Sequence, residues 1–206
     1  YRDDTAGDAA RDKLRWVQQH VANGQLLDVG ANVGYFAREA SAVFRTIGIE
    51  PGRRTVEWGR AHLNAPLEIG SIDEDRDDFH GRFNVVTLFD VIEHVPNPAD
   101  VVARCKQYLA PGGSLFITTP DAGSIMARLL GRQWYYVDLI EHVSLFTRDN
   151  LLHLLNDSGF TVVATRTIGR RYRHSYIERR LRHLATHTPL LRAAHVMALP
   201  LVLTPR

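Results

Sequence analysis

The sequence lacks the features that would place the protein in an oxidising compartment or in a membrane. Its 206 residues include a single cysteine, Cys105, so these residues cannot form a disulfide among themselves. The longest apolar run, AAHVMALPLVL at 193–203, is too short to span a bilayer and contains Pro200. The first residues, YRDDTAGDAARDKL, have no apolar stretch of the kind found in signal peptides. We therefore expect a cytoplasmic protein in which Cys105 is a core thiol.

The net charge is small, but the charges are unevenly distributed. The formal charge is +2, yet residues 68–78 are rich in acids, whereas residues 166–182 hold seven arginines and one acid, Glu178. Both runs are typical of solvated surface. The arginine-rich run also fits a surface that binds anions or a membrane.

Short apolar runs alternate with longer segments of helical period. We expect strands at 25–30, 45–50, 66–71, 83–90, 114–120 and 161–168, and helices at about 34–44, 53–63, 98–110 and 147–158. Asn97 and Pro98 are typical of a helix start, as is Thr147, and Gly159 is typical of a helix end. The pattern predicts one α/β domain over residues 1–206. Its fold would be Rossmann-like and doubly wound, with a mostly parallel sheet of about six or seven strands and helices on both faces.

Two segments do not fit this alternation. Residues 121–146, rich in aromatic side chains, are too long for an ordinary connection and are predicted to be a functional insertion. The segment from about residue 172 is basic and then apolar, with no clear final strand.

The stretch LLDVGANVGYF at 26–36 is typical of a nucleotide-binding loop that follows a central strand. Gly30 would allow a tight turn, and Gly34 would let the next helix begin against the strand. Asn32 stands where such loops often have glycine, and asparagine is the side chain that best tolerates a left-handed backbone. We expect the loop amides and the helix start to face an anionic group. Glu50, at the end of the second strand, lies where an acid binds ribose hydroxyls.

The spacing of the glycines, GANVGY, differs from that of dinucleotide oxidoreductases, and the acid Asp28 precedes the first glycine by two residues. At this point the chain resembles the class I S-adenosylmethionine-dependent methyltransferases, over roughly residues 24–165. The resemblance rests on the loop and on IGIEPG, FNVVTLFDVIEHVPNP, LAPGGSLFITTP and EHVSLFTRDNLLHLLNDSGF. Asn32 departs from the glycine usual in the family's first motif.

The resemblance implies roles for several residues around S-adenosylmethionine. Asp28 and the loop at Gly30, Asn32 and Gly34 would hold the methionine end of the cofactor. Glu50 would accept hydrogen bonds from both ribose hydroxyls. The remaining cofactor-binding residues implied are Ser71 and Ile72 beside the adenine, and Asp90.

A second group of polar residues follows the fourth strand, in DVIEHVPNP. Asp90, Glu93 and His94 would share one side of a helical turn, and Glu141 and His142 follow later in LIEHVSLF. Carboxylates and imidazoles around one pocket can act as bases or bind a divalent metal, and the Glu-His pair can also simply support the cofactor loop.

Here the sequence resembles two metal-assisted subgroups, the ubiquinone-biosynthesis O-methyltransferases and the small-RNA 3′-terminal 2′-O-methyltransferases. That resemblance implies Asp90, Glu93, His94 and His142 as ligands of a divalent metal such as Mg, Mn or Zn. Asp90 is one methylene shorter than the glutamate usual in those groups. Glu93, His94 and His142 are the expected catalytic residues, with His142 as the base if no metal is present.

From these residues we expect an O-methyltransferase that acts on a hydroxyl of a saccharide or another small diol-like acceptor, with 121–146 as a lid. A catechol or phenol O-methyltransferase is the nearest alternative. An RNA-binding protein that methylates a ribose hydroxyl is a further one, disfavoured because no separate RNA-binding domain is evident. A peripheral membrane enzyme that uses the arginines and 193–203 is also consistent with the sequence.

Overall fold

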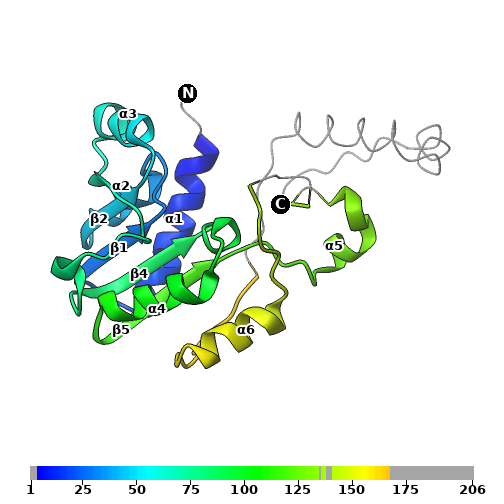
Figure 1. Ribbon diagram of the computed structural model, residues 1–206. Helices are drawn as coiled ribbons and strands as arrows, with labels where there is room; N and C mark the ends of the chain where they lie inside the picture. The colour runs from blue at the N-terminus through cyan, green and yellow to red at the C-terminus, as the bar shows by residue number, and fades with distance from the viewer. Residues whose placement is uncertain (1–3, 135, 138–140, 168–206) are drawn as a thin grey trace. The chain divides into compact units, whose positions relative to one another are not determined.

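A computed structural model describes residues 4–134, 136–137 and 141–167 of the chain (Figure 1). Five parallel strands form one sheet with the order β3-β2-β1-β4-β5. Along the chain the elements are α1 (Asp4–Gln18), β1 (Gln25–Val29), α2 (Tyr35–Ala40), β2 (Arg45–Glu50), α3 (Arg53–Leu63), β3 (Leu67–Ile69), η1 (Asp77–Phe79), β4 (Phe83–Phe89), η2 (Ile92–His94), α4 (Pro98–Tyr108), β5 (Leu109–Thr118), α5 (Ile125–Leu130), η3 (Gly131–Gln133) and α6 (Arg148–Asp157).

The sheet has fewer strands in the described part of the chain than the six or seven predicted. The predicted strand at 161–168 forms no regular structure through residue 167, and Val163 is 83% exposed. Its β-branched residues give the segment strand propensity, but a strand also needs a neighbour with which to exchange hydrogen bonds. The other predicted strands are present.

Neighbouring residues of the central strand β1 face two separate cores. Leu26 of β1 packs with Leu14 of α1 and Phe36 of α2, whereas the next residue, Leu27, packs with Val101 of α4. This period of two confirms a doubly wound α/β sheet with helices on both faces. Cys105 is fully buried beside Val101, and burial raises the pKa of its thiol to about 12, which confirms the expected core thiol.

Helix ends follow local sequence signals. The hydroxyl oxygen of Thr147 accepts a hydrogen bond from the Asn150 amide in a capping box, and Gly159, with φ of 74°, follows the end of α6. Pro98 occupies the first turn of α4, but Asn97 makes no side-chain cap. The helix α1 was not predicted, although its residues Ala10, Leu14 and Val17 form a buried apolar stripe.

The insertion at 121–146 leaves the core and returns to it at the same point. Asp121 and Phe146 form a parallel bridge, and the Ala122 amide donates to the Phe146 carbonyl oxygen at 2.7 Å. Between these ends lie α5 and the turn η3, and Ile125 and Leu129 of α5 are each 77% exposed. A lid function for this segment stays a prediction.

Contacts divide the chain into a unit that ends at Ala164 and a second that begins at Thr165. The basic segment predicted from about residue 172, and its proposed contact with a membrane, lie outside the described residues. Within the described residues, no helix combines the length and the apolar character that crossing a membrane requires.

Candidate active site

The strand order reverses at the carboxyl ends of β1 and β4. From β1 the chain proceeds outward to β2 and β3, and it then returns to place β4 on the other side of β1. In open α/β sheets such a reversal of strand order is where ligands bind. Asp28 lies in β1, residues 30–34 follow this strand, and residues 90–94 follow β4, so both sequence-predicted groups lie where the strand order reverses (Figure 1).

The loop after β1 has the backbone that its glycines and asparagine predict. Gly30, Asn32 and Gly34 have φ angles of 67°, 52° and 86°. A Cβ atom on Gly30 would lie 2.6 Å from Val91 Cγ2, and one on Gly34 would lie 2.5 Å from the Ala65 Cβ. Both glycines are therefore required by conformation and by space. The first contact also shows that the loops after β1 and β4 touch.

The amides of residues 30–34 are bonded within the protein, which corrects the expectation that they face an anionic group, whereas the same role for the start of α2 stays a prediction. The Gly30 and Ala31 amides both donate to the Ile49 carbonyl oxygen, and the Gly34 amide donates to Ala31. The Val33 amide donates to Asn32 Oδ1 at 2.7 Å. Left-handed asparagine commonly offers its side chain to nearby amides, and the remaining amides of the loop are satisfied by Ala31, Ile49 and Glu50.

Glu50 connects this loop to the end of β2. Its Oε2 accepts the Asn32 amide at 3.1 Å, and its Oε1 accepts the Gly52 amide at 3.0 Å. A carboxylate has about four lone-pair directions, so two amides leave capacity for further donors. The role predicted for Glu50 at the ribose hydroxyls stays a prediction that this geometry permits.

Asp28 is a carboxyl group held inside the protein, with only 3% of the residue exposed. Its Oδ1 accepts the Thr87 hydroxyl at 2.7 Å from the neighbouring strand β4. Burial raises the pKa of Asp28 to about 7, against the hydrogen bond from Thr87 and the charge of Lys13, which both lower it. Asp28 thus lies under the loop with a charge that is costly in the absence of a cationic partner.

Ser71 and Ile72 follow β3 at the same edge of the sheet. The Ser71 hydroxyl donates to Asp73 Oδ2 and accepts the Asp73 amide, so it forms a local turn. Ile72 is 6% exposed and packs in the core with Phe79. Contact of these two residues with adenine stays a prediction.

Asp90 begins the second loop with a left-handed backbone, φ 60°. Its Oδ2 accepts Lys13 Nζ at 3.0 Å, and its Oδ1 accepts the Thr118 hydroxyl at 3.1 Å. The Lys13 ammonium also lies 4.8 Å from the centre of the Phe89 ring. The structure therefore directs Asp90 towards α1 and β5.

The other three predicted ligands come together. Glu93, His94 and His142 each offer one ligand atom, and these atoms lie within 4.8 Å of one another. Glu93 is 2% exposed, and its Oε2 accepts the Thr119 hydroxyl at 3.0 Å. Burial is the main cause that raises the pKa of the Glu93 carboxyl, and the nearby charge of Asp90 raises it further.

Backbone carbonyls orient both imidazoles of this cluster. His94 Nδ1 lies 2.9 Å from the Glu141 carbonyl oxygen, and His142 Nδ1 lies 3.0 Å from the Tyr136 carbonyl oxygen. A carbonyl can only accept, so Nδ1 carries the hydrogen in both rings and Nε2 has the free lone pair.

One carboxylate and two imidazoles fit a divalent metal by the chemistry of the donors, with Nε2 as the nitrogen of each ring that is able to coordinate. Ligand histidines in proteins usually donate their second N–H to a carbonyl or a carboxylate, as both rings do here. Three protein ligands would leave coordination positions for an acceptor or water. Asp75, Asp77 and His80 also lie close together, but all three are exposed.

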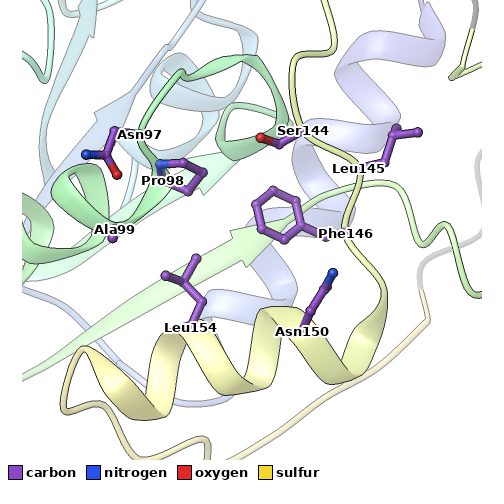
Figure 2. A pocket seen from close by; sticks show the side chains of 8 residues that line it. All are labelled: Asn97, Pro98, Ala99, Ser144, Leu145, Phe146, Asn150 and Leu154. Atoms are coloured by element: carbon purple, nitrogen blue, oxygen red, sulfur yellow. The ribbon is translucent and has the colours of Figure 1, made fainter.

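A groove of about 360 Å³ lies beside this cluster, between the start of α4, the helix α6 and residues 144–146. Figure 2 shows the Phe146 ring within it, facing Pro98 and Leu154. The eight lining residues, Asn97, Pro98, Ala99, Ser144, Leu145, Phe146, Asn150 and Leu154, include no titratable side chain. The Ser144 amide donates to the Glu93 carbonyl oxygen at 3.1 Å, so the groove marks where the insertion is fastened to the core.

Sequence reasoning missed four residues that hold the site, namely Lys13, Thr87, Thr118 and Thr119. The two adjacent threonines stand at the end of β5, beside the loop after β4, and each donates to one acid of that loop. Hydroxyl residues at a strand end next to an acidic loop were the available signal. The sequence offers no comparable signal for Lys13, because its partner Asp90 is 77 residues away in the sequence.

Comparisons with known proteins agree on the family. Residues 1–165 match the methyltransferase domain family. The ubiquinone biosynthesis O-methyltransferase of Thiobacillus denitrificans is 33% identical over 132 residues, 59% of this chain and 57% of that protein. The enzyme of the same name from Erwinia tasmaniensis is 34% identical over 125 residues, 54% of this chain and 50% of that protein. The chain thus spans about half the length of these curated relatives.

Solved structures share the fold. A protein from Thermotoga maritima, described as an S-adenosylmethionine-dependent methyltransferase and possible histamine N-methyltransferase, superposes with a TM-score of 0.63 at 21% identity, over 76% of this chain and 73% of that one. YcgJ from Bacillus subtilis gives a TM-score of 0.63 at 13% identity, over 91% of this chain and 87% of that one. With four-fifths of its length matched by the family, the chain belongs to the methyltransferase domain family.

Proposed function

We propose that the protein transfers the methyl group of S-adenosylmethionine to a hydroxyl oxygen of a small acceptor, at the carboxyl ends of β1 and β4. The observation that carries this proposal is the cluster of Glu93, His94 and His142 on the loop and insertion beside the glycine loop. The contact between Gly30 and Val91 makes the two loops neighbours. Family membership supports the methyl donor, and the names of the sequence relatives support oxygen as the acceptor atom.

On the cofactor side, Glu50 accepts the ribose hydroxyls and Asp28 faces the amino group of the methionine moiety. A cation near Asp28 would favour its charged form, which burial disfavours in the free protein. Gly30, Asn32 and Gly34 shape the loop beneath the cofactor. Ser71 and Ile72 border the adenine.

In the reaction, the bond between the methyl carbon and sulfur breaks as the bond from that carbon to the acceptor oxygen forms. The electron pair of the broken bond stays on sulfur, so the positive sulfonium becomes a neutral thioether, and the acceptor hydroxyl loses its proton. The protein must therefore align the oxygen with the methyl group and receive a proton. His142 Nε2 carries a free lone pair and is the proton acceptor when no metal is bound.

A divalent ion held by Glu93, His94 and His142 would bind the acceptor oxygen as a Lewis acid and lower the pKa of its hydroxyl. Asp90 is not among the ligands that we propose, since its bonds to Lys13 and Thr118 direct it towards α1 and β5 and it does not belong to the cluster of Glu93, His94 and His142.

For the acceptor we favour a phenolic or catechol-type hydroxyl. Both relatives quoted above are named for ubiquinone biosynthesis, and a quinone precursor carries its hydroxyls on an aromatic ring. Within the insertion, the ring of Tyr136 stacks on His142, and Trp134 packs against Tyr136. The preference for a saccharide, drawn from the sequence, gains no support from these relatives.

Transfer of a labelled methyl group to a panel of acceptors tests this proposal. The panel holds a catechol, a monophenol and a sugar with neighbouring hydroxyls, each with and without chelator. We expect labelled ether product from the catechol, lost in chelator and restored by a divalent ion. His142→Ala should lower turnover by roughly 10² to 10⁴. The exposed His153 on α6 supplies a control, His153→Ala, which should behave as wild type. Cofactor binding without an ether product from any hydroxyl acceptor would refute O-methyl transfer.

A further inference from the structure

The two imidazoles of the cluster come from different parts of the chain, yet both depend on the insertion for their orientation. His94 belongs to η2 of the core, but its Nδ1 is bonded to the carbonyl oxygen of Glu141. His142 belongs to the insertion, and its Nδ1 is bonded to the carbonyl oxygen of Tyr136. Glu93, by contrast, is held by Thr119 at the end of β5 and needs no residue of the insertion for this bond.

Tyr136 contacts His142 in a second way. Its ring stacks on the imidazole with 5.5 Å between ring centres and 9° between planes, so the carbonyl and the ring of one residue fix the same imidazole. The other side of Tyr136 is supported by Trp134, whose ring centre lies 5.1 Å away and which is only 7% exposed. The His142 ring in turn lies edge-on to the His94 ring, with 4.7 Å between the ring centres. A continuous row of rings therefore runs from the buried Trp134 to the core residue His94.

We propose that Tyr136 is a positioning residue that holds His142 with the hydrogen on Nδ1 and the Nε2 lone pair towards Glu93 and His94. The stacked ring holds the imidazole in the plane in which Nδ1 reaches the carbonyl oxygen, and the bond to that oxygen then keeps the hydrogen on Nδ1. With the opposite placement of the hydrogen, Nε2 would be a donor and could neither bind a metal nor accept a proton. This inference rests on the function proposed above.

One consequence concerns the assembly of the site. The carbonyl oxygens of Tyr136 and Glu141 reach the two imidazoles only when the part of the insertion that carries Tyr136, Glu141 and His142 lies close to η2. Displacement of this segment would remove His142 and release His94 at the same time, while Glu93 kept its bond to Thr119. Docking of the insertion therefore completes the set of donors.

The test compares Tyr136→Leu with Tyr136→Phe in the full chain. Leucine keeps the backbone carbonyl and an apolar side chain but removes the ring, whereas phenylalanine keeps the ring. Nitrogen-15 NMR of the histidine rings at a pH where they are neutral reports which nitrogen carries the hydrogen. Co²⁺ serves as the metal probe, followed by calorimetry and by its visible absorption.

We expect His142 of the wild type and of Tyr136→Phe to show the hydrogen on Nδ1, and of Tyr136→Leu to show a mixture of both forms. Tyr136→Leu should bind Co²⁺ about 10 to 100-fold more weakly, with S-adenosylmethionine affinity unchanged and with rescue by Tyr136→Phe. A His142 spectrum in Tyr136→Leu identical to that of the wild type would overturn the positioning role. A wild type that binds no Co²⁺ but shows the expected Nδ1 hydrogen would instead refute only the metal.

Discussion

Asp28→Asn should stabilise the protein at neutral and alkaline pH, although it removes a residue from the proposed cofactor site. Asp28 is buried between β1 and β4, and its pKa is raised from 3.8 to about 7, with burial as the main cause. Asparagine has nearly the same shape, carries no charge, and its Oδ1 can still accept the Thr87 hydroxyl. The substitution therefore removes the cost of a buried charge and little else.

The size of this effect follows from the difference between the pKa of Asp28 in the folded and in the unfolded state. Because the pKa of Asp28 is raised in the folded state, its stabilising contribution is fully present below the unfolded value of 3.8. That contribution is lost as pH rises through about 7. A difference of about 3 pKa units corresponds to about 4 kcal/mol. The free energy of unfolding of Asp28→Asn, minus that of the wild type, should thus increase by about 4 kcal/mol between pH 4 and pH 8.

Urea denaturation of both proteins without cofactor, at half-unit steps of pH, measures this quantity. Taking the difference between the two proteins cancels the other titrating groups, and any cost of burying the asparagine amide adds only a constant. Thr87→Val offers a second reading. The hydrogen bond from Thr87 lowers the pKa of Asp28, so loss of the hydroxyl should raise that pKa. The pH at which Asp28 loses its stabilising contribution should therefore be higher in Thr87→Val. If the free energy of unfolding of Asp28→Asn minus that of the wild type stays constant from pH 4 to pH 8, the inference that Asp28 is a costly buried charge is wrong.

Three further predictions concern the predicted cofactor site, the glycine loop and the insertion. Glu50→Ala should weaken binding of S-adenosylmethionine by about 1.5 to 3 kcal/mol for each charged hydrogen bond lost, measured by calorimetry, whereas the exposed Glu57→Ala should not. Gly34→Ala should lower the free energy of unfolding more than Gly112→Ala. Both glycines have positive φ, at 86° and 75°, but only Gly34 has a neighbour within 4 Å of the added Cβ, so equal losses would contradict the steric argument. Hydrogen exchange in 121–134 should slow when cofactor and acceptor bind together, and unchanged exchange in all states would count against a lid.

Apolar runs predicted the sheet well because buried parallel strands must be apolar on both faces. β2 begins and ends at the predicted residues, Arg45 and Glu50. The left-handed Asn32 was also predicted, since few side chains other than glycine tolerate that backbone. The stretch at 161–168 was predicted from propensity alone, and propensity cannot supply a neighbouring strand.

The site was predictable as a set of residues but not as a set of contacts. The motifs placed Glu93, His94 and His142 together, because loops at the carboxyl ends of neighbouring strands converge. The pairing of Asp90 with Lys13 depends on how α1 crosses the sheet, which no local pattern encodes. The orientation of the imidazoles depends on the backbone carbonyls of Tyr136 and Glu141, and any residue type would supply those.

The irregular pairing of β4 with β5 shows where the chain can change length without damage. Phe83 pairs with Leu109, but Val85 pairs with Ser114, so residues 110–113 form a bulge at the amino end of the two strands. From Val85 to Phe89 the register is unbroken, and it delivers Thr118 and Thr119 to Asp90 and Glu93. A residue added or removed within 110–113 would be absorbed in the bulge. The same change between Ser114 and Thr118 would turn each hydroxyl to the opposite face and separate both acids from their donors.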